Sequence, residues 1–274
     1  MKKYISSEIY KLFKTNPFRI CVLLDLVYIL YKICSTIFMA RYYSRPENYE
    51  QIISQYVSVG YDISQANYIV QRMTNPLGLD ILCECCVGFI ISGFMAGSFW
   101  SQEYKYGTFL QLISRGISKK KIFWGKLITS WLGTIAISIL NIALYFGSVC
   151  IIFDVGKISG NLLEYCFRYF IVIVASSLMF VACAQLLAIL CKSTAVALGG
   201  IALINIAGSS IVTTVSNIIS DNIEIDYYWF ISTPFYMLDY TMSIGKYNVG
   251  LLTILIYSLI FVILGYLIFE NKDI

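Results

Sequence analysis

The stretch EYKYGTFLQLISRGISKKKIFWGK, residues 103–126, is the longest polar interruption in a chain that is otherwise strongly apolar. It holds six of the twenty Lys and Arg residues, yet Phe109, Leu110, Leu112 and Ile113 keep an apolar stripe running through it. Long apolar runs lie on both sides of the segment. It therefore predicts a connection between two membrane-spanning helices, exposed on one side of the membrane.

The composition is that of an integral membrane protein. Of the 274 residues, 58% are hydrophobic and 13% are charged, whereas soluble domains have roughly 45–50% apolar and about 25% charged residues. Aromatic residues make up 16% of the chain, which is typical of proteins that place rings at the two lipid–water boundaries. The chain has no His, which excludes His-based triads and His-dependent membrane proteases. We expect no nucleic-acid partner.

Six segments are apolar and long enough to span a membrane, which requires about 20 residues each. We therefore expect an all-α polytopic fold with one transmembrane domain over residues 1–274. The fourth and fifth spans are separated only by CKST, residues 191–194, which predicts a tight helical hairpin. The predicted spans are residues 18–40, 81–100, 127–152, 167–190, 194–216 and 248–269.

The first 17 residues predict an amphipathic helix that lies in the membrane interface and ends near Pro17. Its Lys residues fall largely off an apolar stripe. A cleaved signal peptide is the competing interpretation, but the following apolar run is too long and carries Asp25 and Lys32. The stripe consists of Ile5, Ile9, Leu12 and Phe13.

The distribution of Lys and Arg predicts the orientation. With six spans and a cytoplasmic N-terminus, the C-terminus is also cytoplasmic. The outer segments then contain five basic residues: Arg41, Arg45, Arg72, Lys157 and Lys246. The inner segments contain thirteen: Lys2, Lys3, Lys11, Lys14, Arg19, Lys105, Arg115, Lys119, Lys120, Lys121, Lys126, Lys192 and Lys272.

Two outer segments are long. Residues 41–80 are rich in Tyr and partly helical by their spacing. Residues 217–247 contain four acids and many aromatic residues. This segment is too aromatic for a solvated linker and too charged for a membrane span. We expect residues 217–247 to form a re-entrant or interfacial helical piece before the last span.

Two local patterns in the sequence resemble chemical sites. Cys83, Cys85 and Cys86 match no standard zinc spacing, and inert buried thiols are the favoured interpretation over a metal or redox site. Gly125–Lys126 lacks both the earlier Gly and the following Ser or Thr of a phosphate-binding loop. We therefore expect the chain to bind no cofactor and to hydrolyse no ATP on its own.

Charges inside predicted spans are costly and often functional. Asp25 and Lys32 lie on one face of the first span, two turns apart. They are candidates either for interhelical structural contacts or for groups that line a pathway. Glu164 and Arg168 have the i, i+4 spacing of a local salt bridge at the start of the fourth span.

The order of residues in the polar connection resembles that of the permeases of type-2 ATP-binding-cassette (ABC) exporters. A Glu, a Gly-Thr pair, a Leu-rich patch, a Ser followed by a basic residue, and a Gly-Lys pair occur in sequence. The N-terminal amphipathic helix, six spans and acidic-aromatic segment before the last span agree with that family. Two positions depart from it, since Lys105 replaces an acid and Lys119 replaces an Arg.

This resemblance implies that residues 103–126 form a coupling helix which inserts into a groove of a separate ATPase subunit. ATP and Mg²⁺ would be bound by that subunit, present in two copies, and a second permease, identical or related, would complete the pore. A bacterial plasma membrane is the implied location. The implied coupling residues are Glu103, Gly107, Thr108, Phe109, Leu112, Ser118, Lys119 and Lys126.

Other interpretations remain. A helix with an apolar stripe and basic flanks can also lie on anionic lipid without a protein partner. The whole chain could be a membrane sensor or accessory protein that binds a ligand through its outer loops. The acidic outer segments are similar to those of permeases that expel antimicrobial peptides or confer immunity to them, while lipid, polysaccharide or drug-like cargo stays open. These acids are Asp221, Glu224, Asp226 and Asp239.

Overall fold

The computed structural model describes residues 2–43, 45–64, 66–67, 70, 76–152, 162–219, 225–237 and 243–272, although some side chains inside helices, chiefly those of residues 76–90, lie outside that description. Every element that it defines within these residues is a helix. The elements are α1 (Lys2–Lys14), α2 (Asn16–Tyr43), α3 (Pro46–Ser58), α5 (Pro76–Lys105), α6 (Thr108–Ser114), α7 (Lys119–Ile152), α8 (Leu162–Cys191), α9 (Thr194–Leu203), η2 (Ile204–Gly208), α10 (Ser209–Ile219), α11 (Ile225–Tyr228), α12 (Thr233–Met237) and α13 (Ile244–Asn271).

Three helices among the described residues are long and apolar enough to cross a membrane: Lys119–Leu144 of α7, Phe167–Cys191 of α8 and Ile244–Asn271 of α13. They correspond to the third, fourth and sixth predicted spans. The first and second predicted spans lie within α2 and α5, which are continuous helices but contain side chains outside the described set. The all-helical class is confirmed, and the structure supports a membrane protein.

The fifth predicted span is not one regular helix. Residues 194–216 form α9, the π-helical segment η2 and α10. A π-helical turn widens the backbone and interrupts the i→i−4 hydrogen bonds. Gly208, at the end of this turn, lies so close to the Trp229 indole that an added Cβ would come within 2.8 Å of it. The α-helix of the fifth segment is therefore interrupted where the Trp229 ring packs against its backbone.

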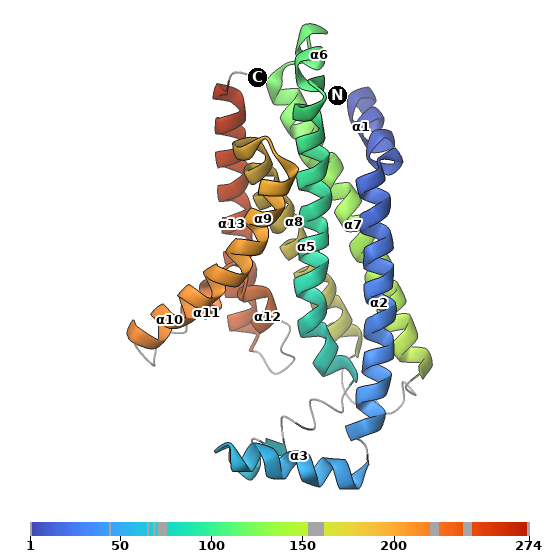
Figure 1. Cartoon of the computed structure of the whole chain (residues 1–274), viewed down its shortest axis with the longest axis vertical. Coiled ribbons are helices and arrows are strands. Elements are labelled where there is room, and N and C mark those ends of the chain that lie inside the picture. Colours follow the sequence, from blue (N-terminus) through green and yellow to red (C-terminus); the bar gives the residue numbers. More distant parts are fainter. Residues whose placement is uncertain are drawn as a thin grey trace.

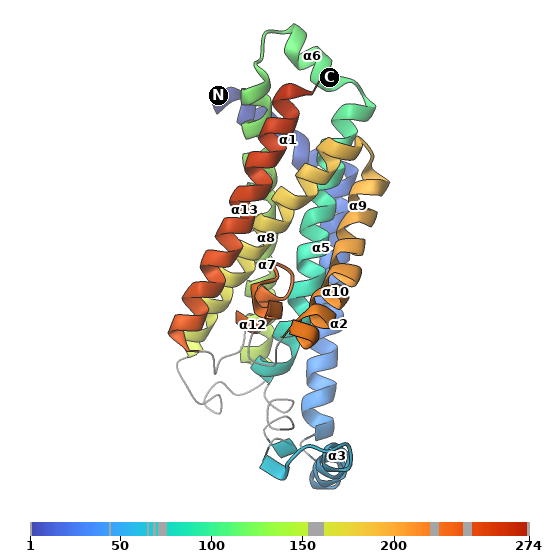
Figure 2. The same cartoon turned by 90° about the vertical axis from the view of Figure 1, so that its left-hand side faces the viewer.

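The long helices form a bundle with distinct ends. α6, α1 and the C-terminal end of α13 lie at one end, whereas α3 lies across the other end (Figure 1). The view turned by 90° gives the same order along the bundle (Figure 2). α8 packs against both α5 and α13 in the centre. The polar connection therefore lies at the same end of the bundle as α1 and the end of α13.

The turn between α8 and α9 agrees with the predicted hairpin. Lys192 has a φ of 52°, the left-handed conformation in which helices commonly terminate. Its N–H donates to the carbonyl of Ala188 at 2.9 Å. α9 then packs back on α8, and a Cβ on Gly200 would lie 3.2 Å from Leu187. Residues 191–194 thus reverse the chain between two packed helices.

The segment before the last span folds onto α13. Thr233 Oγ1 donates to the carbonyl of Tyr227 at 2.7 Å, and the Tyr227 hydroxyl donates to the carbonyl of Lys246. A Cβ on Gly250 would lie 2.6 Å from the sulfur of Met237. These contacts hold α11 and α12 against the start of α13, which agrees with a packed helical piece. Its depth in a membrane stays a prediction.

Candidate functional site at the polar end of the bundle

The polar connection contains a short helix with a defined start and end. Gly107, just before α6, has a φ of 62°, and Gly116, just after it, has a φ of 79°. Only Gly adopts this region without strain. After α6, the backbone N–H of Gly116 donates to the carbonyl of Ile113 at 2.9 Å. The N–H of Ile117 donates to the carbonyl of Leu112 at 3.1 Å. This is a Schellman ending, so the chain turns sharply on both sides of α6.

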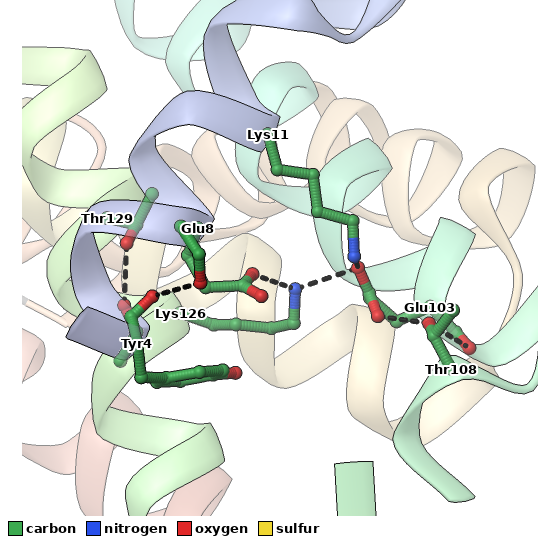
Figure 3. A network of polar contacts seen from close by, with 9 residues as sticks. Tyr4, Glu8, Lys11, Glu103, Thr108, Lys126 and Thr129 are labelled. Atoms are coloured by element: carbon green, nitrogen blue, oxygen red, sulfur yellow. Dashed lines mark hydrogen bonds and ion pairs between the residues drawn. The ribbon is translucent and has the colours of Figure 1, made fainter. Parts of the chain in front are cut away.

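A buried ion cluster lies beneath this helix (Figure 3). Lys126 Nζ, on α7, donates to Glu8 Oε2 of α1 at 2.7 Å and is 3.0 Å from Glu103 Oε1 of α5. Lys11 Nζ, also on α1, donates to the same Glu103 oxygen at 2.5 Å. The hydroxyl of Thr108, at the start of α6, donates to Glu103 Oε2. The cluster joins four helices: α1, α5, α6 and α7.

The charges of the cluster compensate one another. Lys126 is fully buried, and Glu103 and Glu8 are 3% and 4% exposed. Burial raises the pKa of Glu103, but the ammonium of Lys126, followed by the hydrogen bonds from Lys11 and Thr108, holds that pKa below its ordinary value. Lys126 Nζ also lies 4.1 Å from the centre of the Phe99 ring, a favourable cation–π contact.

Tyr4 connects α1 to the middle of this site. Burial, and then the negative charges of Glu8 and Glu103, raise the pKa of its hydroxyl. Its ring occupies the space beside Gly125, where any Cβ would overlap it. The Gly of the Gly125–Lys126 pair therefore has a structural role: its missing side chain lets α1 approach α7, and the next residue then reaches Glu8.

Phe109 anchors α6 to an aromatic cluster inside the bundle. Its ring is 1% exposed and lies 5.6 Å from Trp100, 4.7 Å from Tyr104 and 5.4 Å from Phe269, measured between ring centres. Such pairs contribute about 0.5–1.5 kcal/mol each beyond the burial of their area. Leu112 and Ile113 are half-buried against the same cluster. The sequence predicted this apolar patch as a docking surface, but Phe109 faces inward because the bundle provides its pocket.

The outward face of the connection is formed by other residues. Tyr106 is 66% exposed and Leu110 is 55% exposed. Ser118 is exposed, and its carbonyl accepts the hydrogen bond from Ile122 that begins α7. Two apolar side chains at the tip of a polar connection are therefore available for contact.

Lys119 is bound within the chain. Its Nζ donates to the carbonyls of Glu270 and Lys272 at 3.1 and 2.9 Å. Lys272 Nζ in turn donates to the carbonyls of Ile189 and Leu190, at 2.6 and 3.1 Å. Free carbonyls at the ends of helices are natural acceptors for Lys. The start of α7 is thereby tied to the ends of α13 and α8.

The structure brings together Glu103, Thr108 and Lys126 of the predicted coupling residues, but Asp25 and Lys32 lie elsewhere in the bundle. Asp25 is 1% exposed, and its Oδ1 accepts a hydrogen bond from Asn141 Nδ2 of α7 at 3.0 Å. Lys32 is 7% exposed, with Nζ 5.8 Å from the centre of the Tyr28 ring. Asp25 thus makes an interhelical contact, and a pathway role for either residue stays a prediction.

Other predicted groups fall outside the described side chains: Glu164 and the thiols of Cys83, Cys85 and Cys86. The described part of the chain contains no group of three His, Cys, Asp or Glu side chains that could hold a metal ion. Arg168 is described, and its guanidinium lies 5.6 Å from the centre of the Tyr247 ring.

Glu8 and Lys11 were missed from the sequence, although one signal for Glu8 was available. Glu8 is the only acid among residues 1–17 and follows Ile5 by three positions and precedes Leu12 by four. It therefore lies on the apolar stripe of its helix, where a charge needs a partner. No local pattern connects Glu8 to Lys126, which is 118 positions away.

The fold and site define a class: a helical protein with membrane-spanning helices and a buried ion cluster under a short connecting helix. Residues 26–274 match the family described as "Protein of unknown function (DUF2705)", and the chain belongs to this family. No curated protein matches the sequence. The matched region includes Glu103 and Lys126, whereas Glu8 and Lys11 precede it.

Proposed function

We propose that this chain is the membrane-spanning permease subunit of an ABC exporter. In this proposal α2, α5, α7, α8, the α9–α10 stretch and α13 are the six spans, with both termini in the cytoplasm of a bacterial cell. The chain moves its substrate outward and is not itself an ATPase. Two copies of a separate ATPase subunit bind ATP and Mg²⁺, and a second permease, identical or related, completes the pathway.

One observation carries this proposal: α6 presents the exposed side chain of Leu110, while Phe109 and Thr108 of the same helix contact the long helices. Leu110 is exposed on α6 and Tyr106 is exposed just before it, while Phe109 holds α6 in the aromatic cluster. An exposed apolar side chain on a short helix can enter the groove of a partner protein. A contact of this kind agrees with the resemblance of residues 103–126 to a coupling segment.

The ion cluster gives the tip a route for transmitting movement. Because Glu103 contacts Thr108 of α6, Lys11 of α1 and Lys126 of α7, separating these elements would leave a buried charge without its partner. Phe109 packs against Phe269 of α13. In this proposal a displacement of α6 by an ATPase would move α1, α5, α7 and α13 together against the second permease, as in a rigid-body rocking motion.

The proposed cargo is an amphipathic cationic peptide. The support is the acidic and aromatic character of residues 217–247. Among the aromatic residues of this segment, Tyr228 is 51% exposed, whereas Tyr227 and Phe230 are buried in the chain's own core. A peptide would therefore meet Tyr228 rather than the buried rings.

Co-purification tests the proposal. The tagged chain, expressed with a candidate ABC ATPase subunit from the same organism, should retain that ATPase on an affinity column. We expect Leu110→Glu to abolish retention, since a charge replaces an exposed apolar contact without disturbing the buried cluster. Ser114→Glu, a charge at another exposed position of α6, is the matched control and should retain the ATPase. Equal retention by wild type and Leu110→Glu would remove α6 as the docking element, and no retention by wild type would refute the exporter assignment.

A further inference from the structure

A cavity of about 490 Å³ lies between the polar connection and the turn from α8 to α9. It is distinct from the ion cluster, although Glu103 belongs to both. One wall comes from the end of α5 and from α6, including Tyr104, Lys105 and Leu110, and the other comes from Lys192, Ser193 and Ala195. Its volume is within the range of 300–1,000 Å³ typical of ligand sites.

Two ammonium groups give this cavity a positive charge. Lys105 and Lys192 are both exposed, and within the described part of the chain neither has an ion-pair partner. Glu103 also lines the cavity, but Lys11, Lys126 and Thr108 already occupy its oxygens. The uncompensated charge at the cavity is therefore positive, which favours an anionic ligand.

The backbone orients one of these lysines toward the site. Lys192 has a left-handed backbone conformation, with a φ of 52°, which residues other than Gly adopt only at some cost in energy. This conformation ends α8 and places Lys192 beside Tyr104, with Nζ 5.7 Å from the ring centre. The start of α9 borders the same cavity at Ser193 and Ala195, where free N–H groups add to the positive potential. The two ammonium groups remain the main source of charge.

The surroundings of the cavity favour a lipid over a soluble anion. Leu190 and Val196, next to the cavity residues on α8 and α9, are 47% and 53% exposed, and Leu203 further along α9 is 67% exposed. Phe109, Leu110 and Ala195 make much of the lining apolar. Basic pockets between membrane helices on the cytoplasmic side bind anionic head groups. An acyl chain leaving the cavity would continue along exposed aliphatic side chains of α9.

We propose that this cavity binds the phosphate head group of an anionic phospholipid. Lys105 and Lys192 contact the phosphate, and the acyl chains lie along α9. The head group bridges the end of α5 and the α8–α9 turn, and so stabilises the position from which α6 projects. This site needs the membrane placement of the helices but not the ATPase, and its loss would leave the exporter proposal standing.

Native mass spectrometry of the purified full chain in detergent tests this site. The probes are dioleoylphosphatidylglycerol, dioleoylphosphatidylcholine and soluble glycerol 3-phosphate. We expect one tightly retained phosphatidylglycerol and much weaker retention of phosphatidylcholine. The double variant Lys105→Gln/Lys192→Asn should bind phosphatidylglycerol roughly thirtyfold more weakly, because each lysine near a head group contributes about a fivefold gain in affinity. Asn at position 192 tolerates the left-handed backbone.

The matched control is Lys120→Gln/Lys121→Gln, which removes the same charge from two exposed lysines at the same end of the bundle but outside the cavity. Its affinity for phosphatidylglycerol should equal that of wild type. Equal weakening by the two double variants would show diffuse attraction and overturn the site. Equal retention of both lipids, or tight binding of glycerol 3-phosphate alone, would overturn the anionic-lipid assignment. Circular dichroism of each variant establishes that it is folded.

Discussion

Replacing Lys126 with Met removes the central cation of the buried cluster with little change in side-chain volume. Glu8 then loses the donor at 2.7 Å, and Glu103 loses the ammonium at 3.0 Å but keeps Lys11. Breaking a buried ion pair from one side typically costs about 3–5 kcal/mol, because a carboxylate remains buried without compensation. Lys126 is fully buried, so water cannot replace it without rearrangement. For a chain of this size the loss corresponds to a decrease in Tm of roughly 6–20 °C.

The assay is equilibrium unfolding of the purified chain by SDS in mixed micelles, followed by circular dichroism. Lys121→Met, an exposed position on the same helix, is the control and should change the free energy of unfolding by less than about 0.5 kcal/mol. The double variant Lys126→Met/Glu8→Gln should lose about 1–3 kcal/mol less than the sum of its single variants, because the uncompensated charge of Glu8 is gone. Equal losses in Lys126→Met and Lys121→Met would refute the reasoning, and so would strict additivity.

Three further predictions use the same unfolding assay. Gly125→Ala should destabilise the chain by about 1–3 kcal/mol, because the added Cβ overlaps the Tyr4 ring. The control is Gly147→Ala on the same helix, whose added Cβ meets no atom within 4 Å, so this variant should be neutral or stabilising. Destabilisation by both variants would contradict the contact between Gly125 and Tyr4. The pKa of Glu103 is held below its ordinary value of 4.5, so its contribution is complete above that pH and is lost as the pH falls through the lowered pKa. Glu103→Gln should therefore show a weaker loss of stability than wild type between pH 4.5 and acid unfolding, and parallel curves would exclude this role. Asn141→Leu should cost about 1–3 kcal/mol by removing the donor to the buried carboxylate of Asp25, and an unchanged midpoint would show that the bond is not stabilising.

The parts of the fold that sequence could predict depend on local patterns. Pro17 lies one residue inside the start of α2, where a missing N–H costs nothing, and α1 ends just before it. The polar pair Lys192–Ser193 interrupts an apolar run at the α8–α9 turn. Gly107 and Gly116 flank the short helix that residues 103–126 were expected to contain. Each of these features is determined by residues close together in the chain.

The parts that sequence could not predict depend on distant pairings. Lys11 and Glu103 are 92 positions apart, and Asn141 and Asp25 are 116 apart. Phe109 has the same local pattern whether its ring faces a partner or its own bundle. Its inward orientation follows from Trp100 and Phe269, which provide an aromatic pocket only after folding.

Photocrosslinking in membranes that contain both proteins shows directly whether α6 contacts an ATPase. A p-benzoylphenylalanine residue replaces Leu110 at the tip of the polar connection. In a second variant it replaces Val59, which is 77% exposed and lies next to α3 at the opposite end of the bundle. We expect a crosslinked product with the mass of this chain plus the ATPase from position 110 and none from position 59. Crosslinking from position 59 alone, or from neither position in membranes that export the substrate, would contradict a contact between α6 and the ATPase.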